Sequence, residues 1–303
     1  MTLEGVLPVW KPVDFTSHDV VAKVRRMTRI KRIGHTGTLD PKVTGVLPLC
    51  IGRATRVVEY IQELPKEYEA ELTIGYATDT EDATGAITEQ VESVSLTENQ
   101  VEDAVKAFVG VIDQVPPMYS AVKVDGRRLY ELAREGKEIE RKSRKVEIYK
   151  LDIILLALDE PYPRVRFRVL CSKGTYIRTL CADIGKALGY PAVMSALVRT
   201  STGSMTREQC LTLEEIQALA ESGRLQERLI PADQAVSYLP KLTLIESDSA
   251  KALQGRKLHL TLSHEGGAGE AGLYRVYSEK GPFLGIFQWE DKDRQLSPVK
   301  VFN

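Results

Sequence analysis

One segment near the N-terminus concentrates the residues that could carry chemistry. Residues 34–49 read GHTGTLDPKVTGVLPL, with three glycines and two prolines, so we expect a tightly shaped loop. Asp40 precedes Pro41, which pushes its backbone toward an extended conformation. A loop fixed in this way can point one carboxylate into a cleft, where it could serve as a general base or a nucleophile. On these residues alone, an Asp-Pro turn with His35 on the surface is the simpler interpretation.

Other common chemistries lack their sequence motifs. The phosphate-cradling patterns G-x-x-x-x-G-K-[ST] and G-x-G-x-x-G do not occur, nor do H-E-x-x-H and G-x-S-x-G. The four cysteines have no C-x-x-C spacing and the four histidines no metal-ligand spacing. We therefore expect reduced thiols, no metal and no organic cofactor, with catalysis resting on side chains alone.

Charge is segregated along the chain. The formal net charge is −1, but no Lys or Arg occurs from residue 67 through 105, whereas basic residues cluster elsewhere. Such clusters could form a phosphate-binding face, although solvated surface charge explains any single one equally well. Together they favour a polyanionic partner. The clusters are Lys23, Arg25, Arg26, Arg29, Lys31 and Arg32; Arg141, Lys142, Arg144 and Lys145; and Arg164, Arg166, Arg168, Lys173 and Arg178.

Capping residues and periodicity predict the elements that must position this loop. Helices are expected from Thr16 or Ser17, from Thr97 to Gly110, around Leu180 to Gly189, and from Thr212. Apolar and polar residues alternate strictly in residues 66–76, and residues 164–171 alternate with Val165, Phe167 and Val169 on one face, so both segments predict strands. The first strand would place Tyr68 on one face with Ala70 and Leu72, and glutamates on the other.

Two segments differ from the rest of the chain. Residues 123–150 carry ten basic and six acidic residues, which predicts an exposed insertion, helical around 129–134. After Pro240 we expect a short helix, a Gly-rich loop at 264–272 and two strands at 273–277 and 283–287. Strands and helices do not alternate as in a doubly wound fold. We therefore predict an α+β catalytic domain over 1–240, with a mixed, largely antiparallel sheet flanked by helices, and a small β-barrel over 241–303.

The motifs resemble those of the TruB family of pseudouridine synthases. Residues 34–56 resemble the family's catalytic signature, and the resemblance extends over nearly the whole chain without departure at the matched catalytic positions. The tail resembles a PUA-like RNA-binding domain more loosely. The other matching segments are Trp10-Lys11-Pro12, Thr16-Ser17-His18-Asp19, Lys66-Glu67-Tyr68, residues 172–180 and residues 195–200.

The resemblance implies isomerisation of uridine to pseudouridine at position 55, in the T-loop of tRNA. The base must leave its stack, the C1′–N1 bond is cleaved, and the base turns and rejoins through C5. By the match, Asp40 is the essential carboxylate, which either attacks C1′ or removes a proton from C2′. Arg178 would pair with Asp40 and lower its pKa. Tyr68 would stack on the flipped base, and its phenol is a candidate for removing the C5 proton.

Further residues are expected to bind the substrate, each with a structural role as the alternative. His35 would fill the space that the flipped base leaves, and Asp82 would be a polar partner in the pocket or a loop cap. Leu197 would form an apolar wall or ordinary core, as Tyr68 could too. Arg178 could instead bind phosphate or form a structural ion pair. The matched motifs also place Lys11, Lys173 and Tyr176 among the substrate-binding residues.

Partners and location follow from the same resemblance. We expect the T-stem-loop of tRNA as partner, no membrane, no obligatory protein partner and a monomer. The N-terminus has no signal-peptide pattern and the longest apolar run, 153–158, is too short to span a bilayer, so we expect a cytoplasmic protein. One alternative is a guide-RNA-dependent enzyme of the dyskerin kind, which a chain ending at Asn303 disfavours. The other is a non-catalytic tRNA-folding protein, which an intact set of catalytic residues disfavours.

Overall fold

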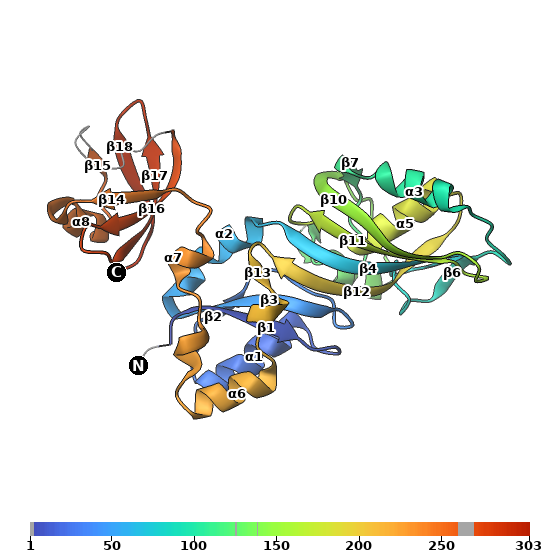
Figure 1. Ribbon diagram of the computed structural model, residues 1–303, viewed down its shortest axis with the longest axis horizontal. Coiled ribbons are helices and arrows are strands. Elements are labelled where there is room, and N and C mark those ends of the chain that lie inside the picture. Colours follow the sequence, from blue (N-terminus) through green and yellow to red (C-terminus); the bar gives the residue numbers. More distant parts are fainter. Residues whose placement is uncertain (1–2, 125, 138, 260–269) are drawn as a thin grey trace.

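A central nine-stranded sheet organises the large domain. The structure is a computed structural model that describes residues 3–124, 126–137, 139–259 and 270–303. The strand order is β1-β3-β12-β4-β11-β10-β7, with β2 on β3 and β13 on β12 (Figure 1). All pairings are antiparallel except β3 with β12, which confirms the predicted mixed, largely antiparallel sheet. The strands are β1 Gly5–Lys11, β2 Ile33–His35, β3 Thr44–Ile51, β4 Lys66–Ile74, β7 Gly110–Gln114, β10 Arg144–Ala157, β11 Arg164–Cys171, β12 Ala192–Thr202 and β13 Met205–Thr206.

Helices begin where the capping residues predict. The hydroxyls of Thr16, Thr97 and Thr212 accept the backbone N–H three residues on, which starts α1, α3 and α6. The prediction for α3 was too long at its end, because residues 107–109 turn and Gly110 already begins β7. The helices of this domain are α1 Ser17–Thr28, α2 Val58–Glu63, α3 Glu98–Lys106, α4 Leu129–Arg134, α5 Ile177–Ala187, α6 Leu213–Glu221 and α7 Ala232–Ala235; the short turns of 3-10 helix are Gly52–Val57, Arg207–Gln209 and Leu225–Arg228.

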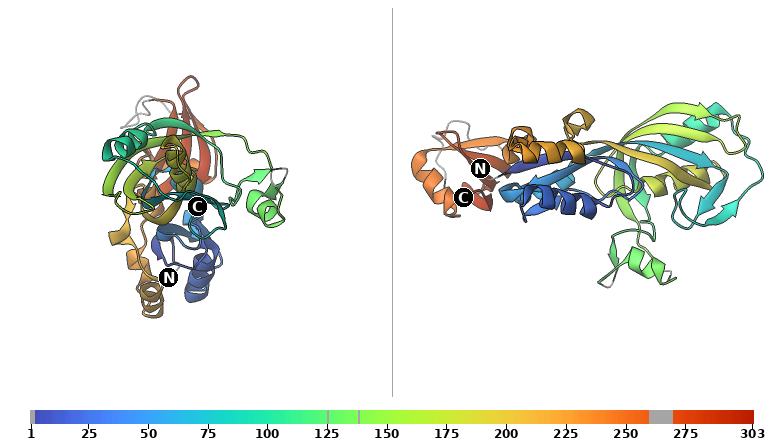
Figure 2. Two further views of the ribbon diagram at one scale, coloured as in Figure 1. Left: turned by 90° about the vertical axis from the view of Figure 1, so that its right-hand side faces the viewer. Right: turned by 90° about the horizontal axis from the view of Figure 1, so that it is seen from below.

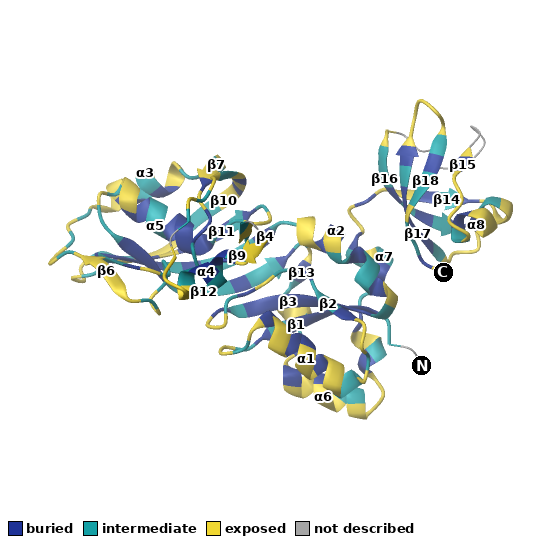
Figure 3. Ribbon diagram, turned by 180° about the vertical axis from the view of Figure 1, so that it is seen from behind, coloured by how far each residue is buried: buried dark blue, intermediate teal, exposed yellow. Residues whose placement is uncertain are grey.

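The two faces of the β4–β11 pair have opposite chemistry. One face buries Ala70, Leu72, Phe167 and Val169 against α5, and Figure 3 shows buried residues along these strands. Because side chains alternate across a strand, the glutamates of β4 lie on the other face, opposite the arginines of β11. The ion pairs there are Arg164–Glu71, Arg166–Glu71, Arg168–Glu67 and Arg168–Glu69.

These ion pairs involve part of the basic cluster at residues 164–178. Arg166 and Arg168 lie 3.3 Å and 2.6 Å from carboxylates of β4. Their charges are matched locally on the sheet surface, so the structure supports paired surface charge for this part of the cluster rather than a phosphate-binding face.

The predicted insertion is an arm, but a shorter one than expected. It carries the hairpin strands β8 Lys123–Val124 and β9 Arg127–Arg128, followed by α4, and it projects from the body in Figure 2. The predicted end at residue 150 was wrong, because β10 begins at Arg144 and pairs with both β7 and β11. Val146 and Ile148 are buried in that sheet. The charged residues that alternate with them suggested an exposed segment.

A small domain with its own core follows the nine-stranded sheet along the chain. Its curled five-stranded sheet has the order β14-β16-β17-β18-β15 and is consistent with a PUA-like half-barrel. Most of the predicted Gly-rich loop at 264–272 lies outside the described residues. No helix in the described ranges is long and apolar enough to cross a membrane. The elements are β14 Lys241–Leu244, α8 Glu246–Leu253, β15 Leu258–His259, β16 Gly272–Ser278, β17 Phe283–Glu290 and β18 Gln295–Val301; in the large domain, β5 Tyr76–Thr78 and β6 Ile87–Gln90 form a separate hairpin.

Candidate active site

Asp40 and Arg178 meet where the loop between β2 and β3 faces the first turn of α5. The Arg178 Nε lies 3.1 Å from the Asp40 Oδ2. The other two guanidinium nitrogens donate to the backbone oxygens of Thr80, at 3.0 Å, and Tyr119, at 2.9 Å. Arg178 is 5% exposed, so these three contacts fix its planar group. The predicted pairing is confirmed, and the arginine is held independently of the carboxylate.

Lys11 links the Asp40 loop to the segment that follows β1. Its ammonium is fully buried and donates to the backbone oxygens of Pro12, Phe15 and Pro41, the last at 3.1 Å. Burial lowers the pKa of Lys11 to about 8, while the charge of Asp40 acts in the opposite direction. All three donors of the ammonium are therefore used within the protein. The structure gives Lys11 a role in shaping the loop rather than a free charge for the substrate.

The pKa of Asp40 is shifted upward, whereas its pairing with Arg178 was expected to lower it. Burial raises the pKa of its carboxyl group, and the negative charge of Asp82 raises it too. Arg178 is the largest opposing influence, followed by Lys11. The net shift is upward, so Arg178 limits the rise in pKa rather than producing a fall. The Asp40 side chain keeps 41% of its surface exposed, which leaves it accessible to a substrate.

Tyr68 and Leu197 share one face of the sheet beside Asp40. In the β4–β12 register, Tyr68 is opposite Arg199 and Ala70 is opposite Leu197, so their side chains point the same way. Tyr68 and Leu197 are both partly buried at the edge of the core. Burial raises the pKa of the Tyr68 phenol, and the charge of Asp40 adds to this rise. Tyr68 is therefore a neutral phenol near the carboxylate.

The turn after β5 lies beside Asp40 and Arg178. The Asp82 carboxylate accepts hydrogen bonds from the hydroxyl of Thr80, at 2.8 Å, and from the backbone N–H of Thr84, at 2.9 Å. Asp82 therefore caps its own turn while its charge acts on Asp40. The neighbouring Glu81, whose φ of 62° is left-handed, was not predicted from the sequence. Its carboxylate accepts from Thr179 at 2.5 Å, and burial raises its pKa.

Three family models together match residues 25–302 except 238 and 239. Residues 25–177 match the family described as "TruB family pseudouridylate synthase (N terminal domain)". This chain belongs to the TruB family. Residues 178–237 match "tRNA pseudouridylate synthase B C-terminal domain", and residues 240–302 match "Pseudouridine synthase II TruB, C-terminal". TruB-family pseudouridine synthases are isomerases, so the protein is an enzyme of that class.

Similar proteins cover nearly the whole chain. A protein of Bacillus pumilus named tRNA pseudouridine synthase B is 44% identical over 304 residues, covering 99% of this chain and 98% of its own length. One of the same name in Geobacillus thermodenitrificans is 48% identical over 265 residues, covering 85% and 86%. The crystal structure of the archaeal box H/ACA sRNP Nop10–Cbf5 complex contains a similar chain, with 27% identity and a TM-score of 0.74 over 99% of this chain and 86% of that one.

Two other predicted substrate-binding residues of this TruB-family chain lie close to the start of α5. Tyr176 precedes the helix, and the buried Gln114 side chain both accepts from and donates to its backbone, at 2.7 Å and 2.9 Å. The Arg144 guanidinium lies 4.8 Å from the centre of the Tyr176 ring, which is a cation–π contact. Lys173 is 56% exposed and pairs with Glu63; the structure does not bring it to Asp40.

His35 is the last residue of β2 and directly precedes the loop that carries Asp40. Its ring lies 5.2 Å from that of His18 in an edge-on arrangement, and its Nδ1 accepts from the backbone of Gly37 at 3.4 Å. Burial lowers the pKa of His35, and the neighbouring His18 acts in the same direction. These effects favour the neutral form of the His35 imidazole.

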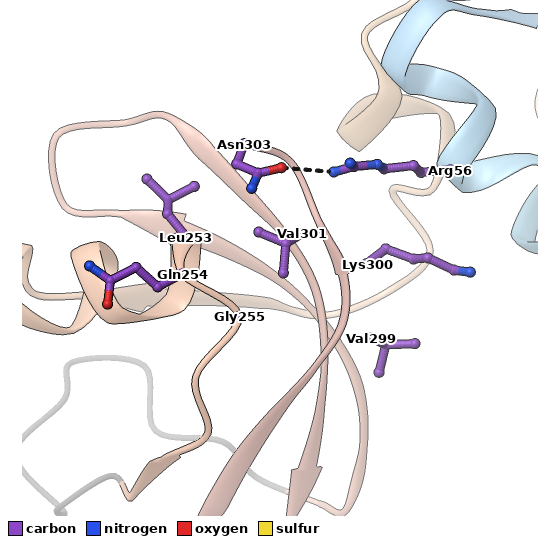
Figure 4. A pocket seen from close by; sticks show the side chains of 8 residues that line it. All are labelled: Arg56, Leu253, Gln254, Gly255, Val299, Lys300, Val301 and Asn303. Carbon is purple, nitrogen blue, oxygen red and sulfur yellow. Dashed lines mark hydrogen bonds between the residues drawn. The ribbon is translucent and has the colours of Figure 1, made fainter. Parts of the chain in front are cut away.

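Two hollows of the described surface lie away from Asp40. One of about 440 Å³ lies between the two domains, where Arg56 donates to Asn303 at 3.4 Å (Figure 4). Another of about 430 Å³ lies at the end of α1 and is lined by Arg25, Arg26, Arg29, Ile30 and Lys31. Within the described ranges, no group of three His, Cys, Asp or Glu residues is placed to hold a metal ion.

Proposed function

We propose that this protein converts uridine to pseudouridine at position 55, in the T-loop of tRNA, with Asp40 as the catalytic carboxylate. The observation that carries the proposal is the 3.1 Å pair between Asp40 and an arginine anchored by two backbone oxygens. Tyr68 and Leu197 on the adjacent sheet face supply a surface for a flipped base. The relatives named tRNA pseudouridine synthase B support tRNA as the substrate.

The reaction begins with entry of the base. Unstacking a nucleotide costs a few kcal/mol, and stacking on an aromatic ring returns about 1–3 kcal/mol. Stacking on Tyr68 and apolar contact with Leu197 therefore offset much of the cost. His35, at the end of β2, would occupy the space that the base vacates. A neutral imidazole and a neutral phenol can both contact an uncharged pyrimidine without desolvating a charge.

Asp40 then acts in its ionised form. Either it attacks C1′ and the uracil leaves with the electrons of the C1′–N1 bond, or it removes the C2′ proton and that bond breaks to give a glycal. Both routes need a carboxylate, although burial raises the pKa of Asp40. Arg178 opposes that rise and keeps the anion available. The base then turns and C5 bonds to C1′. In the first route this breaks the Asp40–C1′ bond and releases the carboxylate; in the second, Asp40 returns the proton to C2′. The C5 proton leaves and N1 gains a proton, and Tyr68 is the candidate for removing the C5 proton.

RNA phosphates require cations outside the catalytic cleft. At the end of α1, Arg26, Arg29 and Lys31 surround a hollow and have no ion pair with a carboxylate among the described residues. On the arm, Arg128 and Arg134 lie over the Tyr130 ring, at 5.8 Å and 5.6 Å from its centre. We propose that these two surfaces, together with the 241–303 domain, bind the RNA backbone.

The enzyme is proposed to act alone, in the cytoplasm, as a monomer and without metal. The guide-RNA-dependent alternative draws on the fold similarity to chains in H/ACA complexes. Sequence identity to this chain distinguishes the stand-alone enzyme from the guide-RNA-dependent one. Relatives named tRNA pseudouridine synthase B are 42–48% identical to it, whereas the chains in the H/ACA complexes are 26–27% identical. The stand-alone tRNA enzyme is therefore the better supported function.

Mapping pseudouridine in unmodified tRNA transcripts tests the proposal directly. Purified protein is incubated with transcript alone, and the modified position is read by chemical labelling and primer extension. We expect modification at uridine 55 and none in a transcript with cytidine there. Modification that appeared only with an added guide RNA and accessory proteins would favour the alternative.

A further inference from the structure

The side chain of Glu81 reaches from the turn after β5 to the first turn of α5. Its carboxylate accepts a hydrogen bond from the Thr179 hydroxyl at 2.5 Å. Thr179 is 5% exposed, so water competes little for this bond. A threonine hydroxyl within a helix can donate to a carbonyl of the preceding turn, but this one donates to a different segment of the chain. The proposed mechanism uses neither residue.

The backbone of Glu81 has a conformation that residues with a Cβ rarely adopt. Its φ of 62° is left-handed, a region in which glycine is far less restricted. Two hydrogen bonds to β12 hold the turn there: the Met194 N–H donates to the Glu81 oxygen at 3.1 Å, and the Ala83 N–H donates to the Met194 oxygen at 3.0 Å. Because glycine would suit this backbone better, we expect the glutamate side chain to have a role of its own.

Two adjacent residues of this turn contact two adjacent residues of α5. The Thr80 backbone oxygen accepts from the Arg178 Nη1 at 3.0 Å, and the Glu81 carboxylate accepts from Thr179. The Thr80 oxygen is one of the two backbone acceptors that fix the guanidinium, whose Nε lies 3.1 Å from Asp40. The bond between Glu81 and Thr179 therefore joins the two segments whose relative position sets one anchor of Arg178.

We propose that Glu81 is a positioning residue that, through its hydrogen bond to Thr179, holds the Thr80 oxygen where it anchors Arg178 beside Asp40. The inference rests on the proposed function, in which Asp40 is the reacting group. A small displacement of a catalytic group costs up to about a hundredfold in rate. Loss of the bond should therefore slow the chemical step, whereas RNA affinity should not change, because neither residue lies on a surface proposed to bind RNA.

The link from Thr179 to Arg178 is tested first without RNA. In protein labelled with ¹⁵N-arginine, the Nε–H signal of Arg178 is assigned by its loss in Arg178→Lys, and its exchange with water is measured by NMR. Thr179→Val keeps the shape of the side chain but has no donor, so we expect exchange at least about threefold faster. Thr179→Ser keeps the hydroxyl and should exchange like the wild type. Thr206→Val, which removes an exposed hydrogen bond to Glu208, is the matched control and should change nothing.

Unchanged exchange of the Arg178 Nε–H in Thr179→Val would overturn the inference. If that variant does not fold, Glu81→Gly decides instead, because glycine suits the left-handed backbone and lacks the carboxylate. The exchange rate does not depend on whether the protein modifies tRNA, so this result separates failure of the inference from failure of the proposed function.

A double-mutant cycle then tests the link to catalysis. Single-turnover rates at saturating enzyme and tRNA dissociation constants are measured for wild type, Thr179→Val, Arg178→Met and the double variant. We expect Thr179→Val to be about tenfold slower, with a dissociation constant within about twofold of the wild type. Glu81→Gln, whose amide oxygen still accepts from Thr179, should keep its rate within about threefold.

The Arg178→Met background shows whether the effect passes through the arginine. There, Thr179→Val should slow the reaction by less than about threefold. An equal loss on both backgrounds, or a wild-type rate for Thr179→Val alone, would overturn the proposal.

Discussion

Replacing Arg178 by methionine isolates its effect on Asp40. The change keeps an unbranched side chain but removes the charge, the ion pair with Asp40 and the two hydrogen bonds to backbone oxygens. Two backbone oxygens, those of Thr80 and Tyr119, lose a charged donor, which is worth about 1.5–3 kcal/mol each where burial is complete. Because Asp40 is 41% exposed, water can replace part of its contact, and the Asp40 share is discounted. We expect the free energy of unfolding to fall by about 2–4 kcal/mol.

The same variant should change how the rate depends on pH. Burial raises the Asp40 pKa and Arg178 limits the rise, so losing the arginine raises that pKa further. The fraction of ionised Asp40 then falls at any given pH, and the acidic limb of the rate profile moves to higher pH. Misplacement of the carboxylate adds a loss of about a hundredfold at neutral pH.

The assay is tritium release from RNA labelled at uridine C5, under single-turnover conditions across the pH range. Arg178→Lys keeps the charge but lacks the planar fork, so we expect a smaller shift of the acidic limb with a clear loss of rate. Arg168→Met, which removes an exposed ion pair on the other sheet face, is the control for general effects. An acidic limb that did not move in Arg178→Met would refute the role assigned to Arg178.

Three further expectations address metal, RNA phosphates and the small domain. EDTA-treated enzyme should still modify a prefolded stem-loop, whereas activity restored only by one specific divalent ion would reveal a missed metal site. Replacing Arg26 and Arg29 by glutamine should weaken RNA binding and reduce the slope of log K against log salt by about 1 per lost phosphate contact; an unchanged slope would place the RNA elsewhere. Removing residues 241–303 should weaken tRNA binding more than it slows single-turnover chemistry at saturating enzyme. Ile286 and Phe302 pack on the large domain, so circular dichroism must first show that the shortened chain folds. Normal binding together with lost chemistry would contradict the domain assignment.

Local features of the fold could be predicted because their causes are local. A threonine that caps the N–H three residues on marks a helix start whatever the tertiary structure, as at Thr16 and Thr97. The alternation in residues 164–171 gave β11 its observed limits. Pairing between distant strands leaves no such local mark. The parallel contact of β3 with β12, and the glutamates of β4 opposite the arginines of β11, therefore came only from the structure.

Some residues of the candidate site could be predicted from the sequence and others could not. Asp40, Tyr68 and Arg178 were predicted from motif resemblance, and the structure brings the carboxylate and the arginine together. Glu81 was missed because its burial depends on a left-handed turn. Arg199 lies inside a motif that was recognised, but its place opposite Tyr68 on the neighbouring strand depends on strand register, which a single sequence does not reveal.

The most direct test of the central claim is the Asp40→Asn variant. The amide keeps the size of the side chain and an oxygen that can accept from Arg178, but it cannot act as nucleophile or base. Circular dichroism and tRNA binding are measured beside tritium release from C5-labelled uridine. We expect a folded protein whose RNA affinity is unchanged or slightly higher, since a negative charge is lost, and whose tritium release is at background. Release at near wild-type rate by the folded, RNA-bound variant would show that Asp40 is not the catalytic group.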